Sequence, residues 1–282
     1  MKSELIWSKA LNISKKAVCS GAVIPLETTN YKSNEDNLDY ELRFLNSPIP
    51  KYLTEYGPKQ NPFDPWDYRL EIQPIIDKHI LILNKYPVQI GHMLLITNSW
   101  KAQNEFLDIA DFEAIVRVDN DTTGLWFFNS SKEAGASQPH RHFQLLPRHY
   151  NEEICPRYKW FCSLLNNRKT NISFISHCIS IKARYETNDA DYLFDSYKLM
   201  VEEMKLGDIY NTDKPLKPYN LLITSEWMAL ITRAKDRSNG FSINALGFAG
   251  YFLGTKESNI KNLVRFGPEN ILKNVIEQAE KH

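Results

Sequence analysis

The sequence predicts an α+β protein whose strands are mostly antiparallel. Two apolar runs, Ile80–Leu83 and Met93–Ile96, flank a segment that contains Pro87 and Gly91, a pattern typical of a buried antiparallel pair. Residues 219–235 repeat this strand–turn–strand layout, which indicates two related halves. Helical periodicity elsewhere in the chain supplies the α component.

The other elements are predicted from residue spacing. Apolar residues at helical intervals predict four helices, at residues 5–13, 106–118, 190–204 and 268–281. Further strands are expected at residues 125–128 and 172–181. The polar stretch 28–68, with several prolines, is predicted to be an irregular connector or a loop that lines a site.

The composition of the 282-residue chain argues against several classes of protein. The 34 basic residues balance the 34 acidic ones, so we expect no nucleic-acid partner. No apolar run is long enough to span a bilayer and the N-terminal segment lacks a signal-peptide core, so we expect no membrane partner and a cytoplasmic location. The four scattered cysteines fit reduced thiols better than a zinc site.

The segment NSSKEAGASQPHRHFQLLPR, Asn129–Arg148, concentrates residues with chemical potential. If its second half is extended, His140, His142 and Gln144 project from one face of the strand, because alternate side chains share a face. The small residues before them allow close backbone approach to an anion, and Lys132 adds a positive charge. The segment therefore predicts a phosphate site.

Two imidazoles at this spacing have three interpretations. They could bind zinc, with His92 or Cys155 as a further ligand. They could be structural residues of a sheet. A neutral imidazole could also attack phosphorus and form a phosphoramidate, while its other nitrogen is held by a hydrogen bond, often to a backbone carbonyl. Nucleophilic catalysis fits the polar surroundings best.

The longer pattern GASQPHRHFQ resembles the active-site segment of the transferase branch of the histidine triad superfamily, where glutamine replaces a third histidine. Together with the flanking NSS and LLP it is similar to the ATP adenylyltransferase family, also called diadenosine tetraphosphate phosphorylase. Four further blocks resemble the same family in order, so the resemblance covers most of residues 45–255; they are NPFDPWDYRLEI, HILILNKYPVQIGHMLLIT, PYNLLITSEWMALITRAK and INALGFAGYFL.

This resemblance implies a histidine-triad-like antiparallel sheet with flanking helices. It also implies a catalytic domain at residues 1–170 and a C-terminal ATP adenylyltransferase domain at residues 171–282, packed on the same sheet.

Matched position by position, the resemblance assigns roles to individual residues. It makes His142 the nucleophile, His140 its support and Gln144 the side chain that contacts the reacting phosphate. The substrate-binding residues that it implies are Lys51, Asn84, Lys85, Asn129, Gly135, Ala136, Ser137, Gln138, Thr224, Ser225, Glu226 and Lys235. Glu133 is an unexpected acidic residue in a phosphate-binding loop, and we expect it to face solvent.

The reaction that the resemblance implies is reversible phosphorolysis of diadenosine tetraphosphate. His142 takes the AMP group and releases ATP, and inorganic phosphate then releases the AMP group as ADP. No covalently bound cofactor and no protein metal site are implied, although a divalent cation such as magnesium is expected with the polyphosphate. Two alternatives stay open: a hexose-1-phosphate uridylyltransferase-like enzyme, whose proline between the histidines is Arg141 here, and a non-catalytic nucleotide-binding or sensor protein.

Overall fold

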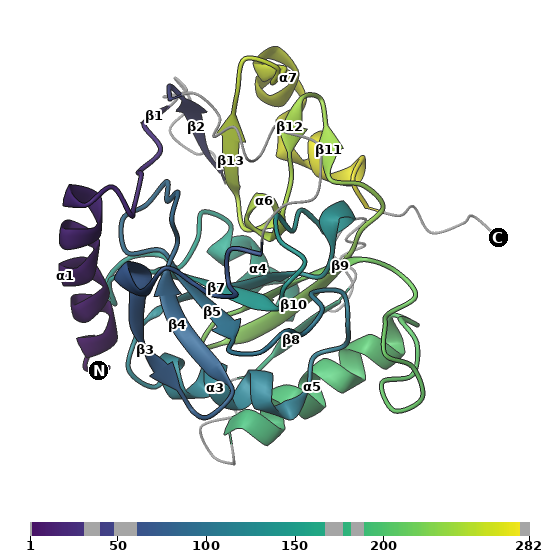
Figure 1. The fold of residues 1–282 in the computed structure, drawn as a ribbon. Helices are drawn as coiled ribbons and strands as arrows, with labels where there is room; N and C mark the ends of the chain where they lie inside the picture. Colours follow the sequence, from purple (N-terminus) through teal and green to yellow (C-terminus); the bar gives the residue numbers. More distant parts are fainter. Residues whose placement is uncertain (1, 31–39, 48–60, 167–176, 182–188, 277–282) are drawn as a thin grey trace.

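An eight-stranded sheet forms the centre of the chain (Figure 1). The computed structural model describes residues 2–30, 40–47, 61–166, 177–181 and 189–276. Every neighbouring pair in the large sheet is antiparallel, which confirms the predicted fold class. In spatial order its strands are β3 (Glu71–Ile75), β4 (His79–Leu83), β5 (Met93–Thr97), β7 (His142–Pro147), β6 (Gly124–Asn129), β9 (Tyr219–Ile223), β10 (Trp227–Thr232) and β8 (His177–Ser180).

The predicted antiparallel pairs are confirmed. Ile80 of β4 lies opposite Ile96 of β5, and Ala229 of β10 lies opposite Leu222 of β9. The second pair joins the first part of the sheet where β9 lies beside β6. Strands from both ends of the chain therefore form one continuous sheet.

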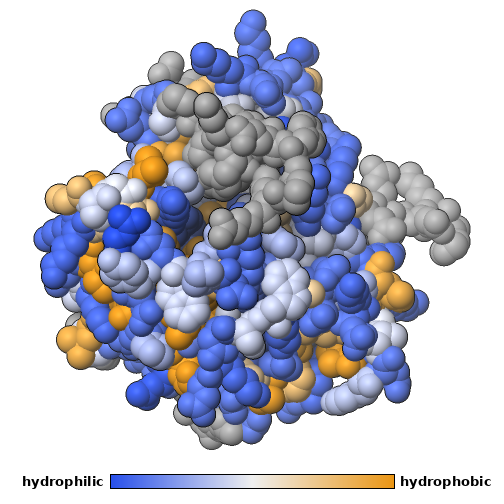
Figure 2. Space-filling view, in the orientation of Figure 1, coloured by the Kyte–Doolittle hydropathy of each residue, from blue (hydrophilic) through white to orange (hydrophobic). Residues whose placement is uncertain are grey.

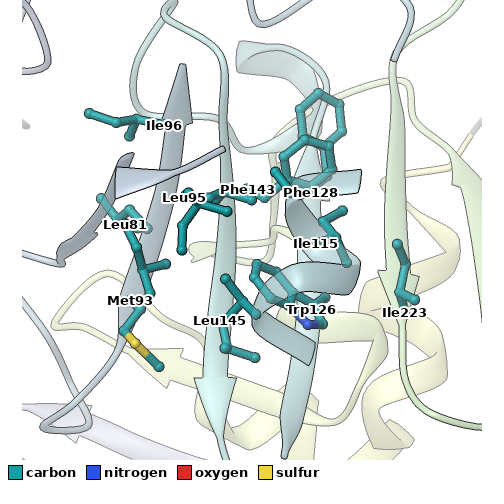
Figure 3. Packing of buried hydrophobic residues seen from close by; sticks show 14 of the residues in the cluster. Leu81, Met93, Leu95, Ile96, Ile115, Trp126, Phe128, Phe143, Leu145 and Ile223 are labelled. Atoms are coloured by element: carbon teal, nitrogen blue, oxygen red, sulfur yellow. The ribbon is translucent and has the colours of Figure 1, made fainter. Parts of the chain in front are cut away.

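Two helices, α3 (Ile109–Asp119) and α5 (Asp189–Glu203), pack against each other below the sheet, as Figure 1 shows. The start of α3 is fixed by a capping box between Asp108 and Asp111. Apolar side chains of α3 and the central strands form the core here, among them Ile115, Trp126 and Phe143 (Figure 3). This face of the sheet is closed by a continuous apolar layer.

The opposite face carries a smaller second layer, drawn at the top of Figure 1. Its apolar cluster packs on Leu125, Phe127 and Leu222 of the large sheet. Apolar surface residues in Figure 2 lie in small groups between hydrophilic ones. The elements of this layer are β1 (Thr28–Asn30), β2 (Glu41–Leu45), β11 (Arg237–Ser238), β12 (Phe241–Ser242), β13 (Tyr251–Gly254), α4 (Tyr158–Asn166), α6 (Ala245–Phe248) and α7 (Ile260–Lys273).

Residues 28–68 were expected to be irregular, and the structure corrects this in part. Strands β1 and β2 form there, and β2 pairs in parallel with β13 from the other end of the chain. The lining-loop interpretation does hold for Asn61 and Phe63, which contact the histidines of the His row, as we call His140, His142 and Gln144.

The helix predicted at residues 268–281 is also corrected. Gly267 has a φ of 73° and interrupts α7, and Pro268 opens its second part. The helix ends at Lys273, and the apolar residues Val275 and Ile276 are buried in a turn instead, while residues 277–281 of the prediction lie outside the described residues.

The other three predicted helices are confirmed, and the N-terminal one is longer than expected, as α1 (Leu5–Cys19). The described part of the strand predicted at residues 172–181 is β8, and residues 172–176 lie outside the described residues. Among the described helices, none combines the length and apolar character required to cross a bilayer.

Candidate active site

The His row lies where β7 begins, in the middle of the large sheet. His142 pairs with Ile96 of β5 and Gln144 with Leu94, so both side chains lie on the upper face. Arg141 and Phe143 point into the lower layer. The predicted alternation is therefore confirmed, although His140 precedes the strand and forms an isolated bridge with Ala102.

The imidazole of His142 is held in one tautomer. Its Nδ1 lies 2.8 Å from the backbone oxygen of His140. Because a carbonyl oxygen only accepts hydrogen bonds, Nδ1 carries the proton and Nε2 has a free lone pair. His140 thus supports His142 through its own main chain.

The side chain of His140 is fixed separately. Asn61 accepts a hydrogen bond from Phe63 N at its Oδ1, so its amide nitrogen donates to His140 Nδ1 at 2.9 Å. The other ring nitrogen of His140 then donates to the backbone oxygen of Thr97 at 3.0 Å and lies 2.9 Å from its hydroxyl. Both nitrogens of His140 are used in holding the ring.

Burial keeps these imidazoles uncharged. His142 is 3% exposed and lies under the ring of Phe63, whose centroid is 5.4 Å away. Loss of hydration lowers the pKa of His142 to about 4, and nearby Arg141 contributes to the shift. Burial also lowers the pKa of His140. A neutral His142 with a free Nε2 is the form required of a nucleophile.

Gln103 joins the two strands that carry the site. Its side-chain oxygen accepts from His142 N at 2.8 Å, and its amide nitrogen donates to Asn129 O at 2.7 Å. The side chain is buried. Gln103 therefore fixes the start of β7 against the end of β6.

Arg141 anchors the row from below. Its Nη1 lies 2.6 Å from Asp111 Oδ2, and both side chains are fully buried. Asp111 also accepts from His79 Nε2 at 3.0 Å. Burial alone would raise the pKa of Asp111, but the charge of Arg141 and the hydrogen bond from His79 hold it below its usual range. Arg141, the residue between the two histidines, is thus one partner of a buried ion pair.

The loop between β6 and β7 is a compact turn. Its internal hydrogen bonds occupy the backbone N–H groups of Ala134, Gly135 and Ala136. Gly135 has a φ of 89° and packs against Asn244, where an added Cβ would lie 2.7 Å from the Asn244 Cβ. Of the predicted phosphate-binding residues at positions 135–138, Ser137 and Gln138 are the ones whose N–H groups make no such bond to the described residues.

Asn129 presents a donor to the site. Its Oδ1 accepts from Asn220 Nδ2 at 2.8 Å and from Ala245 N at 2.9 Å, which fixes the orientation of the amide. The Nδ2 atom is buried without a hydrogen-bond partner among the described residues. An N–H group in this state is suited to an oxygen of a ligand.

Arg233 lies behind this loop and is fully buried. Its guanidinium donates to Ala134 O and Asn220 Oδ1, and to three further backbone oxygens. All of these acceptors are neutral, and burial lowers the pKa of Arg233 to about 10. A buried positive charge therefore holds the loop that contains Ala134.

Asn84 and Lys85 lie at the end of β4, on the side of Gln144 away from His142. Asn84 Nδ2 donates to His92 Nδ1 at 3.0 Å. Lys85 is exposed. The structure thus brings Asn84 toward Gln144 through His92, which was considered above as a zinc ligand and is buried.

The remaining predicted residues are scattered. Thr224, Ser225 and Glu226 form the turn between β9 and β10, at the end of β9 away from Asn220, so the structure does not bring them to His142. Lys235 is exposed beyond β10. Lys51 lies outside the described residues. Glu133 is exposed, as expected, and accepts from Ser131 Oγ at 2.7 Å.

In the described ranges, no three His, Cys, Asp or Glu side chains gather as ligands for a metal ion. Cys155, considered above as a zinc ligand, is buried in the upper apolar cluster. Burial raises the pKa of its thiol to about 12, which disfavours the thiolate that zinc requires.

Sequence patterns missed Asn61, Phe63, Thr97, Gln103 and Asn220. Asn61, Phe63, Thr97 and Gln103 contact His140 or His142, and Asn220 holds Asn129; all of these contacts join residues far apart in the sequence. A local signal existed for His92, in the GH dipeptide before the apolar strand Met93–Thr97, since a histidine at the start of a strand can face the same side as a neighbouring site.

A neutral, oriented imidazole at the start of a central strand, beside a buried amide N–H without a partner among the described residues, defines a candidate site for nucleophilic attack on a phosphoryl group. Residues 1–156 match the family model described as Ap4A phosphorylase N-terminal domain, where Ap4A is diadenosine tetraphosphate. Residues 170–276 match the ATP adenylyltransferase C-terminal domain. The chain therefore belongs to the Ap4A phosphorylase family of ATP adenylyltransferases, which is a family of enzymes.

Relatives in yeast agree with this assignment. Protein APA1 of Saccharomyces cerevisiae is 27% identical over 274 residues, covering 88% of this chain and 85% of the relative. Diadenosine 5',5'''-P1,P4-tetraphosphate phosphorylase 2 of the same yeast is 26% identical over 208 residues, covering 65% of this chain and 64% of the relative.

Crystal structures of yeast Ap4A phosphorylase Apa2 have the same fold as this chain. The complex with AMP superposes with a TM-score of 0.75 at 20% identity and covers 100% of both chains. The complex with Ap4A gives a TM-score of 0.74 at 20% identity and covers 99% of both chains.

Proposed function

We propose that this chain catalyses reversible phosphorolysis of diadenosine tetraphosphate to ATP and ADP through an adenylylated His142. The observation that carries the proposal is the hydrogen bond from His142 Nδ1 to His140 O. It leaves Nε2, on the upper face of the sheet, with a free lone pair. Family membership supplies the substrate class. The names of the yeast relatives agree with it.

The first half-reaction forms a bond between His142 Nε2 and the α-phosphorus. The bond from that phosphorus to the bridging oxygen breaks, and ATP leaves with the electron pair. The positive charge that develops on the ring is stabilised by the hydrogen bond from Nδ1 to His140 O. Polyphosphate leaves as an anion without a proton, so no general acid is required at this step.

In the second half-reaction an oxygen of inorganic phosphate attacks the same phosphorus. The N–P bond breaks, ADP leaves and His142 returns to its neutral state. The Gln144 amide and Asn129 Nδ2 would stabilise the phosphoryl oxygens as charge shifts. Gln144 cannot take a proton from water, so phosphate is favoured over water as the acceptor.

Several finer points belong to the same proposal. ATP, ADP, AMP and inorganic phosphate are its small-molecule partners, and a divalent cation such as magnesium accompanies the polyphosphate. No covalently bound cofactor takes part. A cytoplasmic location stays a prediction.

Product analysis tests the proposal. The chain is incubated with diadenosine tetraphosphate, with and without phosphate, and in parallel with UDP-glucose plus galactose 1-phosphate. Phosphate-dependent formation of ATP and ADP in equal amounts is the expected result. Turnover of the sugar nucleotide would favour the uridylyltransferase alternative, and tight binding of the dinucleotide without products would favour a sensor.

A further inference from the structure

His92 is a buried histidine to which the reaction described above gives no role. It directly precedes β5 and is 8% exposed. Leu94 lies opposite Gln144 in the pairing of β5 with β7, and His92 is two residues before Leu94. His92 and Gln144 are therefore diagonal neighbours on the upper face, within reach of long side chains.

The tautomer of His92 follows from its partners. Tyr86 N donates to Asn84 Oδ1 at 3.0 Å, which turns the amide nitrogen of Asn84 toward His92. That nitrogen lies 3.0 Å from His92 Nδ1 and donates to it. In a neutral ring whose Nδ1 accepts, the proton is on Nε2.

The ring is neutral because it is buried. Burial lowers the pKa of His92 to about 4, against the opposing effect of the nearby Gln144 amide. The face of the ring packs against Phe127, with centroids 5.8 Å apart. His92 is thus a neutral ring that donates from Nε2 near pH 7.

The Nε2–H group of His92 has one candidate hydrogen-bond acceptor, the side chain of Gln144. It makes no hydrogen bond to the described residues, and the long polar side chain beside it on the upper face is that of Gln144, its diagonal neighbour in the pairing of β5 with β7. A buried N–H requires an acceptor, and the acceptor of Gln144 is its amide oxygen.

We propose that His92 is a positioning residue that sets the orientation of the Gln144 amide. Donation from His92 Nε2 to Gln144 Oε1 turns the NH₂ group of Gln144 toward His142 and the phosphoryl oxygens. In the flipped orientation the amide oxygen would face those oxygens and repel them. The inference rests on the proposed function only in naming phosphoryl oxygen as the group that Gln144 meets.

Nitrogen NMR tests the tautomer on the wild-type chain. The protein is labelled with ¹⁵N-histidine, and the His92 signals are assigned by their loss in His92→Gln. We expect a neutral ring protonated at Nε2 near pH 7. Protonation at Nδ1 would overturn the proposal, and this result does not depend on any turnover.

A pair of variants in two backgrounds tests the action through Gln144. His92→Phe removes the donor and should lower kcat by about 10- to 100-fold with little change in KM. His92→Gln restores an N–H near the position of Nε2 and should regain most of the loss. In a Gln144→Ala background, His92→Phe should cost less than about 2-fold, because its target is gone.

Equal losses in the two backgrounds would show a merely structural role and would overturn the inference. If His92→Phe does not fold, as judged by its thermal unfolding, the tautomer measurement decides alone. If the wild-type chain gives no phosphorolysis, the proposed function fails while the tautomer result stands.

Discussion

The buried residues directly below and directly above the His row differ in charge. On the lower face, Arg141 and Asp111 are fully buried ions that neutralise each other at 2.6 Å. On the upper face, His142 and His92 are buried and uncharged, because loss of hydration lowers the pKa of each to about 4. Neighbouring residues of one strand therefore serve stability on one side and chemistry on the other.

The ion pair below the sheet also positions the residues of the site above it. Arg141 donates to the backbone oxygens of Ala102, Glu105 and Phe106. The loop held in this way carries Gln103, which hydrogen-bonds the backbone of His142. The ion pair thus fixes the main chain from which the nucleophile projects, without contact to the substrate side.

Removal of the nucleophile is the change with the largest expected effect on the upper face. His142→Ala should lower the rate of phosphorolysis by about 10⁴-fold or more, because no other group forms the covalent intermediate. Initial rates of ATP release measure this, and Glu133→Gln in the exposed loop is the control with near wild-type rates. A His142→Ala protein with wild-type turnover would rule out the assignment.

Removal of the ion on the lower face comes next. Arg141→Leu should lower the free energy of unfolding by about 3–5 kcal/mol, because the buried Asp111 loses its nearest cation and keeps only His79 and the more distant Lys101. Urea unfolding measures the change. The matched control is Arg237→Leu, whose side chain is 61% exposed and should cost at most about 1 kcal/mol. Equal effects of the two variants would contradict the contrast between faces.

A smaller effect is expected when Gln144 becomes a base. Gln144→His places an imidazole that can accept a proton from water beside the intermediate. The ratio of AMP to ADP formed in the presence of phosphate should rise by about 10-fold or more. Chromatography of the nucleotide products measures the ratio. An unchanged ratio would count against the role given to Gln144.

The smallest effect concerns pH. A group with a pKa of about 4 stays neutral at pH 6, so His142 gains no proton between pH 8 and pH 6. The single-turnover rate of its adenylylation without phosphate should change by less than about 2-fold in this range and fall only near pH 4. An ordinary histidine would lose about three-quarters of its neutral form by pH 6. A loss of that size would show that burial does not control the ring.

Local patterns in the sequence predicted the parts of this site that depend on one strand. Alternation placed His142 and Gln144 together and sent Arg141 to the other face, because the period of a strand is two. It could not name the ionic partner Asp111, which lies on α3. It could not find Asn61 or Gln103 either, because their contacts with the row depend on how separate loops close over the sheet.

The fold was predictable to a similar degree. The apolar pair β4 and β5 was clear because its residues are buried on both sides. The short strand β2 was not, because its parallel partner β13 comes from the far end of the chain. The prediction for α7 missed its first part, before Gly267, and ran past its end at Lys273. Gly267 adopts a positive φ, so the sequence pattern shows a regular helix only after Pro268.

Intact-protein mass spectrometry during a single turnover is the most direct test of the central claim. The chain is mixed with diadenosine tetraphosphate in the absence of phosphate and quenched at short times. We predict a mass increase equal to one adenylyl group, located on His142 by peptide mapping and discharged as ADP when phosphate is added. ADP formation at the full rate with no adduct at any time would contradict the account, since phosphate would then attack the dinucleotide directly.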